Sequence, residues 1–358
     1  MIRARLALAA PALVLAAAAA PAPTPAFAHE QLVTIVAGHP PVFRWVKHAS
    51  QTFIPAVQAA LEGSEHGLKF SEQYGGALAG VGEELEATEE GLAEIGLVSS
   101  LFDPSKLAIQ NVTYVTPFVS ADTAKISSMM DRLQAEDPRM RASWEAVNLE
   151  YLGCAIGIDD YLLMTDFPVE RLADLEGRKI GAPGPAVNWL KGTGAVGVSG
   201  NLTTYYNEIK SGVYDGVIVF ASAALPGKLH EVAPYITRMG FGGQYAGGLA
   251  ANKDWYDAQG IAVKAALKDA CTAYSEAYHA DLDAAVAKAF EVMQGAGATV
   301  TDADAEMRAA WAAGMENNAL EWAARLDAQG QAGSEILSLY MDAMREAGAT
   351  PVRDWDKE

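Results

Sequence analysis

The sequence predicts an α/β protein with two similar lobes, and three observations support this fold class. Short β-rich runs alternate with segments whose apolar residues recur at helical spacing, which is typical of α/β layers. The stretch EEGLAEIGLVSS at 89–100 resembles KSGVYDGVIVFAS at 210–222, and each is a helix end, a glycine and a strand. The chain of 358 residues is long enough for two domains. Because ligands in open α/β sheets sit at the carboxyl ends of strands, two facing lobes would form a binding cleft.

The individual elements alternate along the chain. Strands are expected at 32–38, 68–75, 95–100, 148–158, 178–183, 195–199 and 215–220. Helices are expected at 45–62, 82–94, 120–147, 185–192, 203–212, 254–294 and 302–347. This alternation predicts mainly parallel sheets. The chain is expected to cross between the lobes near residue 154 and again near 245–250.

The first 28 residues have the pattern of a secretory signal peptide. Arg3 and Arg5 give a positive start, an apolar run covers 6–20, and a small-x-small site ends at Ala28. The run is too short to span a membrane. We therefore expect the mature chain to begin near His29 and to be a soluble periplasmic protein.

The charge balance argues against nucleic acid as a partner. There are 26 basic and 45 acidic residues, for a net charge of −19, whereas nucleic-acid binding depends on basic patches. Excess acid keeps an exported protein soluble, and a negative field would also favour cationic ligands.

No motif predicts catalysis, a metal or a cofactor. The six histidines show no metal-ligand spacing. GTGAVG at 192–197 fits G-x-G-x-x-G, but it follows a predicted helix and leads into a strand, so it is interpreted as a helix end rather than a nucleotide loop. The two cysteines lie in a predicted strand (Cys154) and in the long helix (Cys271). Two separate buried thiols are expected, although an oxidising compartment would permit a disulfide.

Several quoted stretches resemble the solute-binding subunits of TRAP transporters, of the DctP type. The resemblance rests on these stretches: PVERLADLEGRKIGAPGP, GAVGV, TTYYNEIKSGVYDG, TIVAGHPP, EATEEGLAEIGLVSS and TPF at 116–118. It implies a two-lobe, type II-like periplasmic binding protein with hinge strands and a long helix spanning both lobes. It also implies a monomer that closes on one small solute and presents it to TRAP membrane permease subunits. The expected lobes are 29–153 plus about 246–285, and 154–245 plus about 286–350.

The chain departs from this family where the family usually holds a carboxylate. An arginine usually ends the D-L-x-G-x-K-I-R strand and pairs with the ligand carboxylate, but that position is Gly181. The family often has a second arginine where this sequence has Tyr161, and an asparagine where it has Val219. Because a buried carboxylate without a cation is costly, these changes argue against the usual anion clamp.

A small amine or amino alcohol, such as ethanolamine, is therefore the favoured solute. Its ammonium would pair with Asp159 or Asp160, and aromatic faces would attract it. The candidate ligand-binding residues are His39, Phe43, Ser99, Asp159, Asp160, Tyr161, Gly181, Trp189, Asn201 and Phe220. The alternatives are that Asp159 and Asp160 are turn acids and that Trp189 and Phe220 belong to the core.

Three other interpretations stay open. One is a small carboxylate or dicarboxylate held by Arg44 or Arg178 in place of the missing arginine. The others are a secreted enzyme on the same scaffold, which no motif supports, and a sensor that presents its solute to a receptor rather than to a permease.

Overall fold

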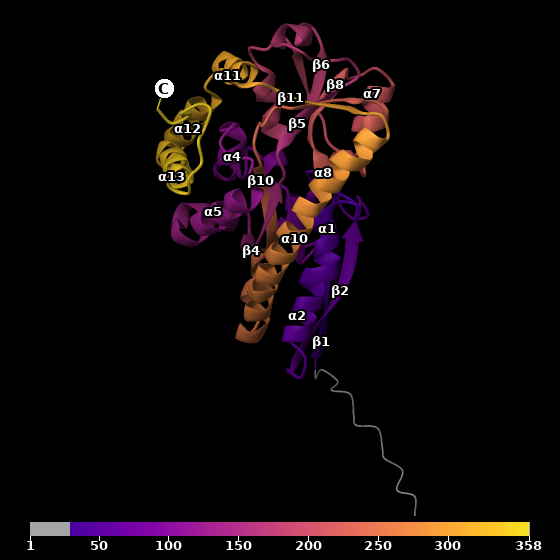
Figure 1. The fold of residues 1–358 in the computed structure, drawn as a ribbon. Coiled ribbons are helices and arrows are strands. Elements are labelled where there is room, and N and C mark those ends of the chain that lie inside the picture. The colour runs from indigo at the N-terminus through magenta and orange to yellow at the C-terminus, as the bar shows by residue number, and fades with distance from the viewer. Residues whose placement is uncertain (1–28, 358) are drawn as a thin grey trace, which may run out of the picture.

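The computed structural model describes residues 29–357, which form two lobes built on two sheets (Figure 1). The first lobe carries a five-stranded sheet of order β2-β1-β3-β10-β4, and the second a six-stranded sheet of order β11-β9-β5-β8-β6-β7. The strands are β1 (His29–Ala37), β2 (His66–Tyr74), β3 (Ile95–Val98), β4 (Leu149–Ile158), β5 (Tyr161–Thr165), β6 (Lys179–Ala182), β7 (Val196–Ser199), β8 (Gly216–Phe220), β9 (Tyr235–Arg238), β10 (Gln244–Asn252) and β11 (Thr299–Asp302). The α/β fold class is confirmed.

The expectation of mainly parallel sheets needs correction, because both sheets are mixed. Strand β10 runs antiparallel to β3 and β4, and β5 runs antiparallel to β8 and β9. Each is the first strand after the chain has crossed from the other lobe. Each lies inside its sheet and runs antiparallel to the neighbours on both sides. The chain passes from one sheet to the other between Ile158 and Tyr161 and returns between Arg238 and Gln244. The lobe boundaries named above stay a prediction.

Most predicted helices form, but several are shorter or divided. The α-helices are α1 (Arg44–His48), α2 (Ile54–Ala60), α3 (Glu84–Glu89), α4 (Val112–Val115), α5 (Thr123–Glu136), α6 (Pro138–Glu145), α7 (Tyr205–Lys210), α8 (Ala221–Ala224), α9 (Lys253–Asp257), α10 (Ile261–Gly295), α11 (Ala305–Gly314), α12 (Asn318–Ala328) and α13 (Gly333–Glu346). The helix expected at 120–147 breaks where Asp137 caps α6 and Pro138 occupies its first turn. The helix expected at 185–192 is a 3-10 helix, Gly184–Leu190.

Helix α10 connects the two lobes. Its 35 residues give it a length of about 50 Å. It packs against β4, α1 and α2 of the first lobe and against α8 and β11 of the second, and Figure 1 shows it crossing from one lobe to the other. The expected long helix spanning both lobes is therefore present.

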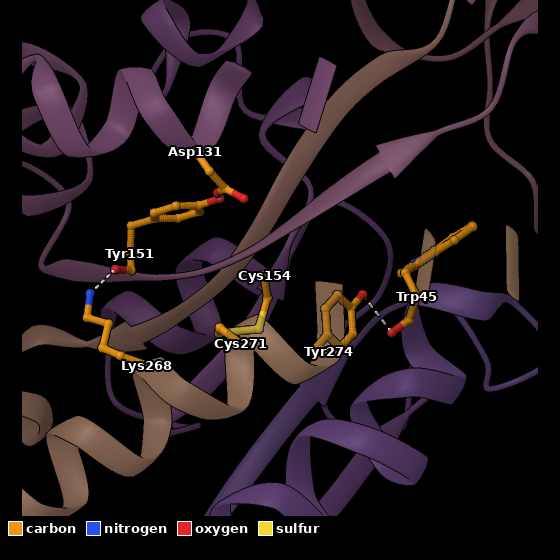
Figure 2. Close-up of a disulfide and its surroundings, with 7 residues drawn as sticks. All are labelled: Trp45, Asp131, Tyr151, Cys154, Lys268, Cys271 and Tyr274. Carbon is orange, nitrogen blue, oxygen red and sulfur yellow. Dashed lines mark hydrogen bonds between the residues drawn. A yellow bond between two sulfur atoms is a disulfide. The ribbon is translucent and has the colours of Figure 1, made fainter. Parts of the chain in front are cut away.

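The expectation of two separate thiols is wrong, because Cys154 and Cys271 form a disulfide between β4 and α10 (Figure 2). Where β4 pairs with β10, Leu249 faces Gly153 and Gly248 faces Ala155, so Cys154 is an extra residue in the ladder. Its φ of 56° marks this β-bulge. The bulge directs its side chain toward α10, which strand periodicity alone does not predict.

Candidate functional site

The interlobe cavity lies between the sheets and is lined by residues of both lobes and of the strands that connect them. The first lobe contributes the loop at His39, and the second contributes β8 and the start of α7, while β4 and β10 form its inner wall. The space that admits the centre of a water molecule is about 30 Å³, which is room for one or two waters. In this conformation the cavity is therefore too small for a solute of several heavy atoms.

Aromatic rings make most of the cavity wall. Trp45 of α1 lies 6.1 Å from Phe220 of β8, centroid to centroid, so these rings face each other across the lobes. Phe220 contacts the edge of the Tyr161 ring at 5.1 Å. Trp45 is held in place from α10, because Tyr274 Oη donates to its backbone oxygen at 3.1 Å (Figure 2).

The polar atoms at the cavity are few and neutral. The hydroxyls of Tyr114 and Tyr161 share a hydrogen bond of 3.0 Å. His39 Nε2 and Tyr205 Oη are buried and have no hydrogen-bond partner among the described residues. Burial lowers the pKa of His39 to about 4 and raises the pKa of Tyr205 well above its usual value, so both side chains are uncharged at neutral pH. Among the described lining residues, none is an Asp, Glu, Lys or Arg.

A buried carboxylate positions the loop that carries His39. Glu84 Oε1 accepts from the backbone N–H of Gly38 at 3.0 Å, and its Oε2 accepts from Gly82 at 2.7 Å. Burial outweighs these hydrogen bonds and raises the pKa of Glu84 to about 7. The imidazole is therefore presented to the cavity by a loop tied to α3.

Comparison with known proteins identifies the family. The family model for bacterial extracellular solute-binding protein family 7, DctP, matches residues 55–325. The chain belongs to this family. No curated protein matches it.

The DctP-type protein shares its fold with solved TRAP solute-binding proteins at low sequence identity. The periplasmic ectoine-binding protein of the Halomonas elongata TeaABC TRAP transporter is 18% identical, with a TM-score of 0.75 and coverage of 88% of this chain and 100% of that one. Bordetella pertussis DctP7, which binds pyroglutamic acid, is 18% identical, with a TM-score of 0.74 and coverage of 88% and 99%. A marine metagenome TRAP protein specific for aromatic acids is 18% identical, with a TM-score of 0.77 and coverage of 88% and 98%. At these identities the likeness concerns the two-lobe fold.

Four of the predicted ligand-binding residues of the DctP-type protein line the cavity, namely His39, Ser99, Tyr161 and Phe220. Phe43 lies one layer behind, stacked on Trp45 with ring centroids 5.0 Å apart. Val219, which the family resemblance in the sequence matched to a usual asparagine, is also a lining residue.

The two predicted acids do not line the cavity. Asp159 accepts hydrogen bonds from the backbone N–H of Ser222 at 3.1 Å and from its hydroxyl at 2.5 Å, at the start of α8. Asp160 Oδ1 accepts from the Gly242 N–H at 2.8 Å. Burial raises the pKa of both carboxyls to about 6. Both acids brace the segments that connect the sheets.

Gly181, Trp189 and Asn201 also lie outside the lining. A Cβ on Gly181 would lie 3.0 Å from ring carbons of Tyr214, so this position faces the second lobe's core. Trp189 Nε1 donates to the Tyr114 backbone oxygen at 2.7 Å, and the indole packs behind the cavity wall. Asn201 Oδ1 accepts from the Thr203 N–H at 2.9 Å in the turn that leads into α7.

Neither alternative arginine reaches the cavity lining. Arg44 Nη1 donates to Asp281 Oδ2 of α10 at 2.5 Å. The Arg178 guanidinium lies over the Phe167 ring at 4.1 Å and is 3.9 Å from an Asp215 oxygen. Each of these cations is engaged on another face of its lobe.

Sequence reasoning missed several lining residues, including Trp45, Phe102, Tyr114 and Tyr205. Tyr205 begins a helix shortly after the carboxyl end of β7, which is where ligand contacts concentrate in α/β sheets. Trp45 carried only the signal of an apolar helix position, and its place opposite Phe220 depends on lobe packing.

The described residues show no other cofactor or membrane feature. Between residues 29 and 357 no group of three or more His, Cys, Asp or Glu side chains could hold a metal ion. Over the same range no helix is both long and apolar enough to cross a bilayer.

Proposed function

We propose that this chain is the periplasmic solute-binding subunit of a TRAP-type importer. It captures one small solute between its lobes and presents it to membrane permease subunits, without turning the solute over. Membership of the DctP family and the two-lobe fold support this role. The signal-peptide pattern, which falls outside the described residues, supports export.

The solute carries no net negative charge. The observation that supports this class is the cavity lining, in which ring faces and neutral hydrogen-bonding atoms are present without an ionised side chain among the described residues. A carboxylate enclosed there would lose its hydration without gaining a cation, at a cost of several kcal/mol. The rings instead suit a compact apolar or flat molecule with one or two polar groups.

The amine or amino alcohol predicted from the sequence is the second candidate. Asp159 and Asp160 do not line the cavity, so the expected ion pair has lost its support. The ring faces of Trp45, Tyr161 and Phe220 favour this candidate, because a desolvated cation gains about 2 kcal/mol from a good aromatic face. A weakly hydrated quaternary ammonium fits this wall better than the primary ammonium of ethanolamine.

The carboxylate alternative requires a cation that lies elsewhere in this conformation. Arg44 and Arg178 are bound to Asp281 and Asp215, and neither belongs to the lining. The acids named for related structures belong to those proteins, at identities below 25%.

A thermal-shift screen of the secreted protein tests the proposal. The panel contains uncharged phenols and cyclic amides, then choline and ethanolamine, then pyroglutamate and D-glucuronate. Saturation at a hundredfold excess over Kd adds about 2.7 kcal/mol to the free energy of unfolding. We expect stabilisation by uncharged or ammonium compounds; stabilisation by the acids alone would overturn the proposal.

A matched pair of variants locates the site. Tyr205→Phe removes a buried cavity hydroxyl, whereas Tyr206→Phe removes the exposed hydroxyl that donates to Glu231 at 3.0 Å. The first substitution should reduce the thermal shift given by a stabilising compound and the second should leave it unchanged. If both substitutions changed the thermal shift equally, that compound would bind outside the interlobe cavity.

A further inference from the structure

A second crevice, here called the hinge crevice, lies beside the segments that connect the two sheets. Its volume is about 450 Å³, and it shares no lining residue with the interlobe cavity. Lys125 of α5 lines it from the first lobe. Asp160 and Gly240 line it from the two connecting segments, and Arg308 lines it from α11. The crevice therefore adjoins both segments that connect the sheets.

Most charged groups of the hinge crevice already have partners. Arg238 Nε and Nη2 donate to the two oxygens of Asp302 at 2.6 and 2.7 Å. Asp160 accepts from the backbone N–H of Gly242. The Lys125 ammonium lies 3.8 Å from an Asp122 oxygen, and its side chain lines the crevice.

Arg308 is less completely paired. Its charge acts on Asp160 against the effect of burial on the pKa of that carboxyl, but its hydrogen bonding is incomplete. Its Nε is buried and has no hydrogen-bond partner among the described residues. Its Nη2 donates to the backbone oxygen of Gly240 at 3.4 Å, which is long for a hydrogen bond. A buried guanidinium donor without an acceptor is unfavourable. The Arg308 side chain also lines the crevice, and the planar guanidinium fork matches the two oxygens of an oxyanion.

Gly240 provides the space in which this guanidinium lies. Its φ is +66°, and a Cβ there would lie 2.9 Å from Arg308 Nη2 and 3.2 Å from Nε. The absence of a side chain thus allows the fork to rest against the connecting segment before β10. Any larger residue would displace Arg308 from this position.

We propose that the hinge crevice binds a small oxyanion, with Arg308 as the principal donor and Lys125 as a second cation. The ligand class is inorganic phosphate, sulfate or the carboxylate of a small organic acid. With Asp160 and Asp302 ionised, Lys125, Arg238 and Arg308 leave the lining with one net positive charge. Because Lys125 belongs to the first lobe and Arg308 rests on the segment that connects the sheets, the bound anion stabilises the arrangement that brings them together. This inference is independent of the solute proposed for the interlobe cavity.

Calorimetric titration with sodium sulfate, sodium phosphate and sodium acetate in dilute, chloride-free buffer tests the site. We expect at least one of the three anions to give saturable binding. Arg308→Gln should weaken that binding at least tenfold, and Gly240→Ala should weaken it by displacing the guanidinium. Arg171→Gln is the control, because it removes the same charge from a site where Arg171 is 79% exposed.

The outcomes are distinguishable. Loss of binding in Arg308→Gln and Gly240→Ala, with Arg171→Gln unchanged and all circular dichroism spectra native, supports the site. Lack of saturation by all three anions in the wild-type protein overturns it. Equal weakening by Arg308→Gln and Arg171→Gln also overturns it, because the effect would then follow net charge rather than the crevice. If Arg308→Gln does not fold, the single variants Gly240→Ala and Lys125→Gln are each compared with Arg171→Gln in the same way.

Discussion

The hydroxyl of Tyr114, in α4, lies 3.0 Å from the hydroxyl of Tyr161, the first residue of β5. Both side chains are almost completely buried. The pair therefore forms a neutral polar point in a wall that is otherwise made mainly of rings and aliphatic groups. The family resemblance in the sequence predicted that Tyr161 replaces a usual arginine, and the structure has a neutral hydroxyl pair at this point.

We expect Tyr161→Phe to destabilise the protein by about 1–3 kcal/mol, because it leaves the buried Tyr114 hydroxyl without its partner. The double variant Tyr114→Phe/Tyr161→Phe should recover part of this loss, since no unpaired hydroxyl then remains. Urea denaturation measures both. The pairing would be contradicted if the double variant lost as much free energy of unfolding as Tyr114→Phe and Tyr161→Phe lose together, or more.

Removal of the disulfide should lower stability while leaving the fold intact. The bond closes a sequence separation of 117 residues, for which typical stabilisation is about 2–4 kcal/mol. We expect Cys154→Ser/Cys271→Ser to unfold at lower urea concentration, and the wild type to do the same in dithiothreitol. Dithiothreitol should not affect the double variant. An unchanged transition in reductant would show that the thiols are not paired in solution.

Gly181→Arg should destabilise the protein without creating a carboxylate site. Its Cβ would lie 3.0 Å from ring carbons of Tyr214, and overpacking of this kind costs about 1–3 kcal/mol. Tyr214→Ala in the same chain should relieve part of the strain. We expect no thermal stabilisation of Gly181→Arg by pyroglutamate or glucuronate. Such stabilisation would place this position in the binding site after all.

Stability should depend on pH through Glu84. Burial raises its folded pKa to about 7, above the value of about 4.3 in an unfolded chain. The folded state therefore binds more protons between these values, so the contribution of Glu84 to stability is present below pH 4 and is lost as pH rises to 7. This contribution is on the order of 3–4 kcal/mol. His39 acts in the opposite sense between about pH 4 and 6.5, because burial lowers its pKa.

The comparison of wild type with Glu84→Gln isolates this effect. The difference between their free energies of unfolding should change between pH 5 and pH 7.5, with the wild type losing more stability as pH rises. The contributions of His39 and of the other buried carboxyls to the pH dependence are the same in both proteins, so they cancel in the difference. A difference that does not change with pH would show that Glu84 is ionised throughout.

The fold could be predicted from the sequence to a large extent. Alternating strand and helix patterns gave the order of most elements, and the quoted family stretches gave the two-lobe type. The directions of β5 and β10 could not be predicted, because they depend on how the chain enters each sheet after crossing. The expected pairing state of Cys154 was wrong because one extra residue in β4 redirects its side chain.

The candidate site, too, could be predicted from the sequence only in part. His39, Ser99, Tyr161 and Phe220 could be named because they lie in a quoted loop or at the ends of strands. Asp159 and Asp160 follow β4 directly, yet backbone N–H groups of Ser222 and Gly242 bind them away from the cavity. The hydrogen bonds formed when distant segments pack decide the role of such acids.

The sequence by itself determined the family, the alternation of elements and the absence of an arginine at residue 181. These properties depend on residue identity and local spacing. Only the tertiary structure decided that Tyr214 fills the space beside Gly181 and that the interlobe cavity has rings where carboxylates were expected. The physical reason is that the direction of a side chain depends on what packs against it, and at this site the contacts join residues of different lobes.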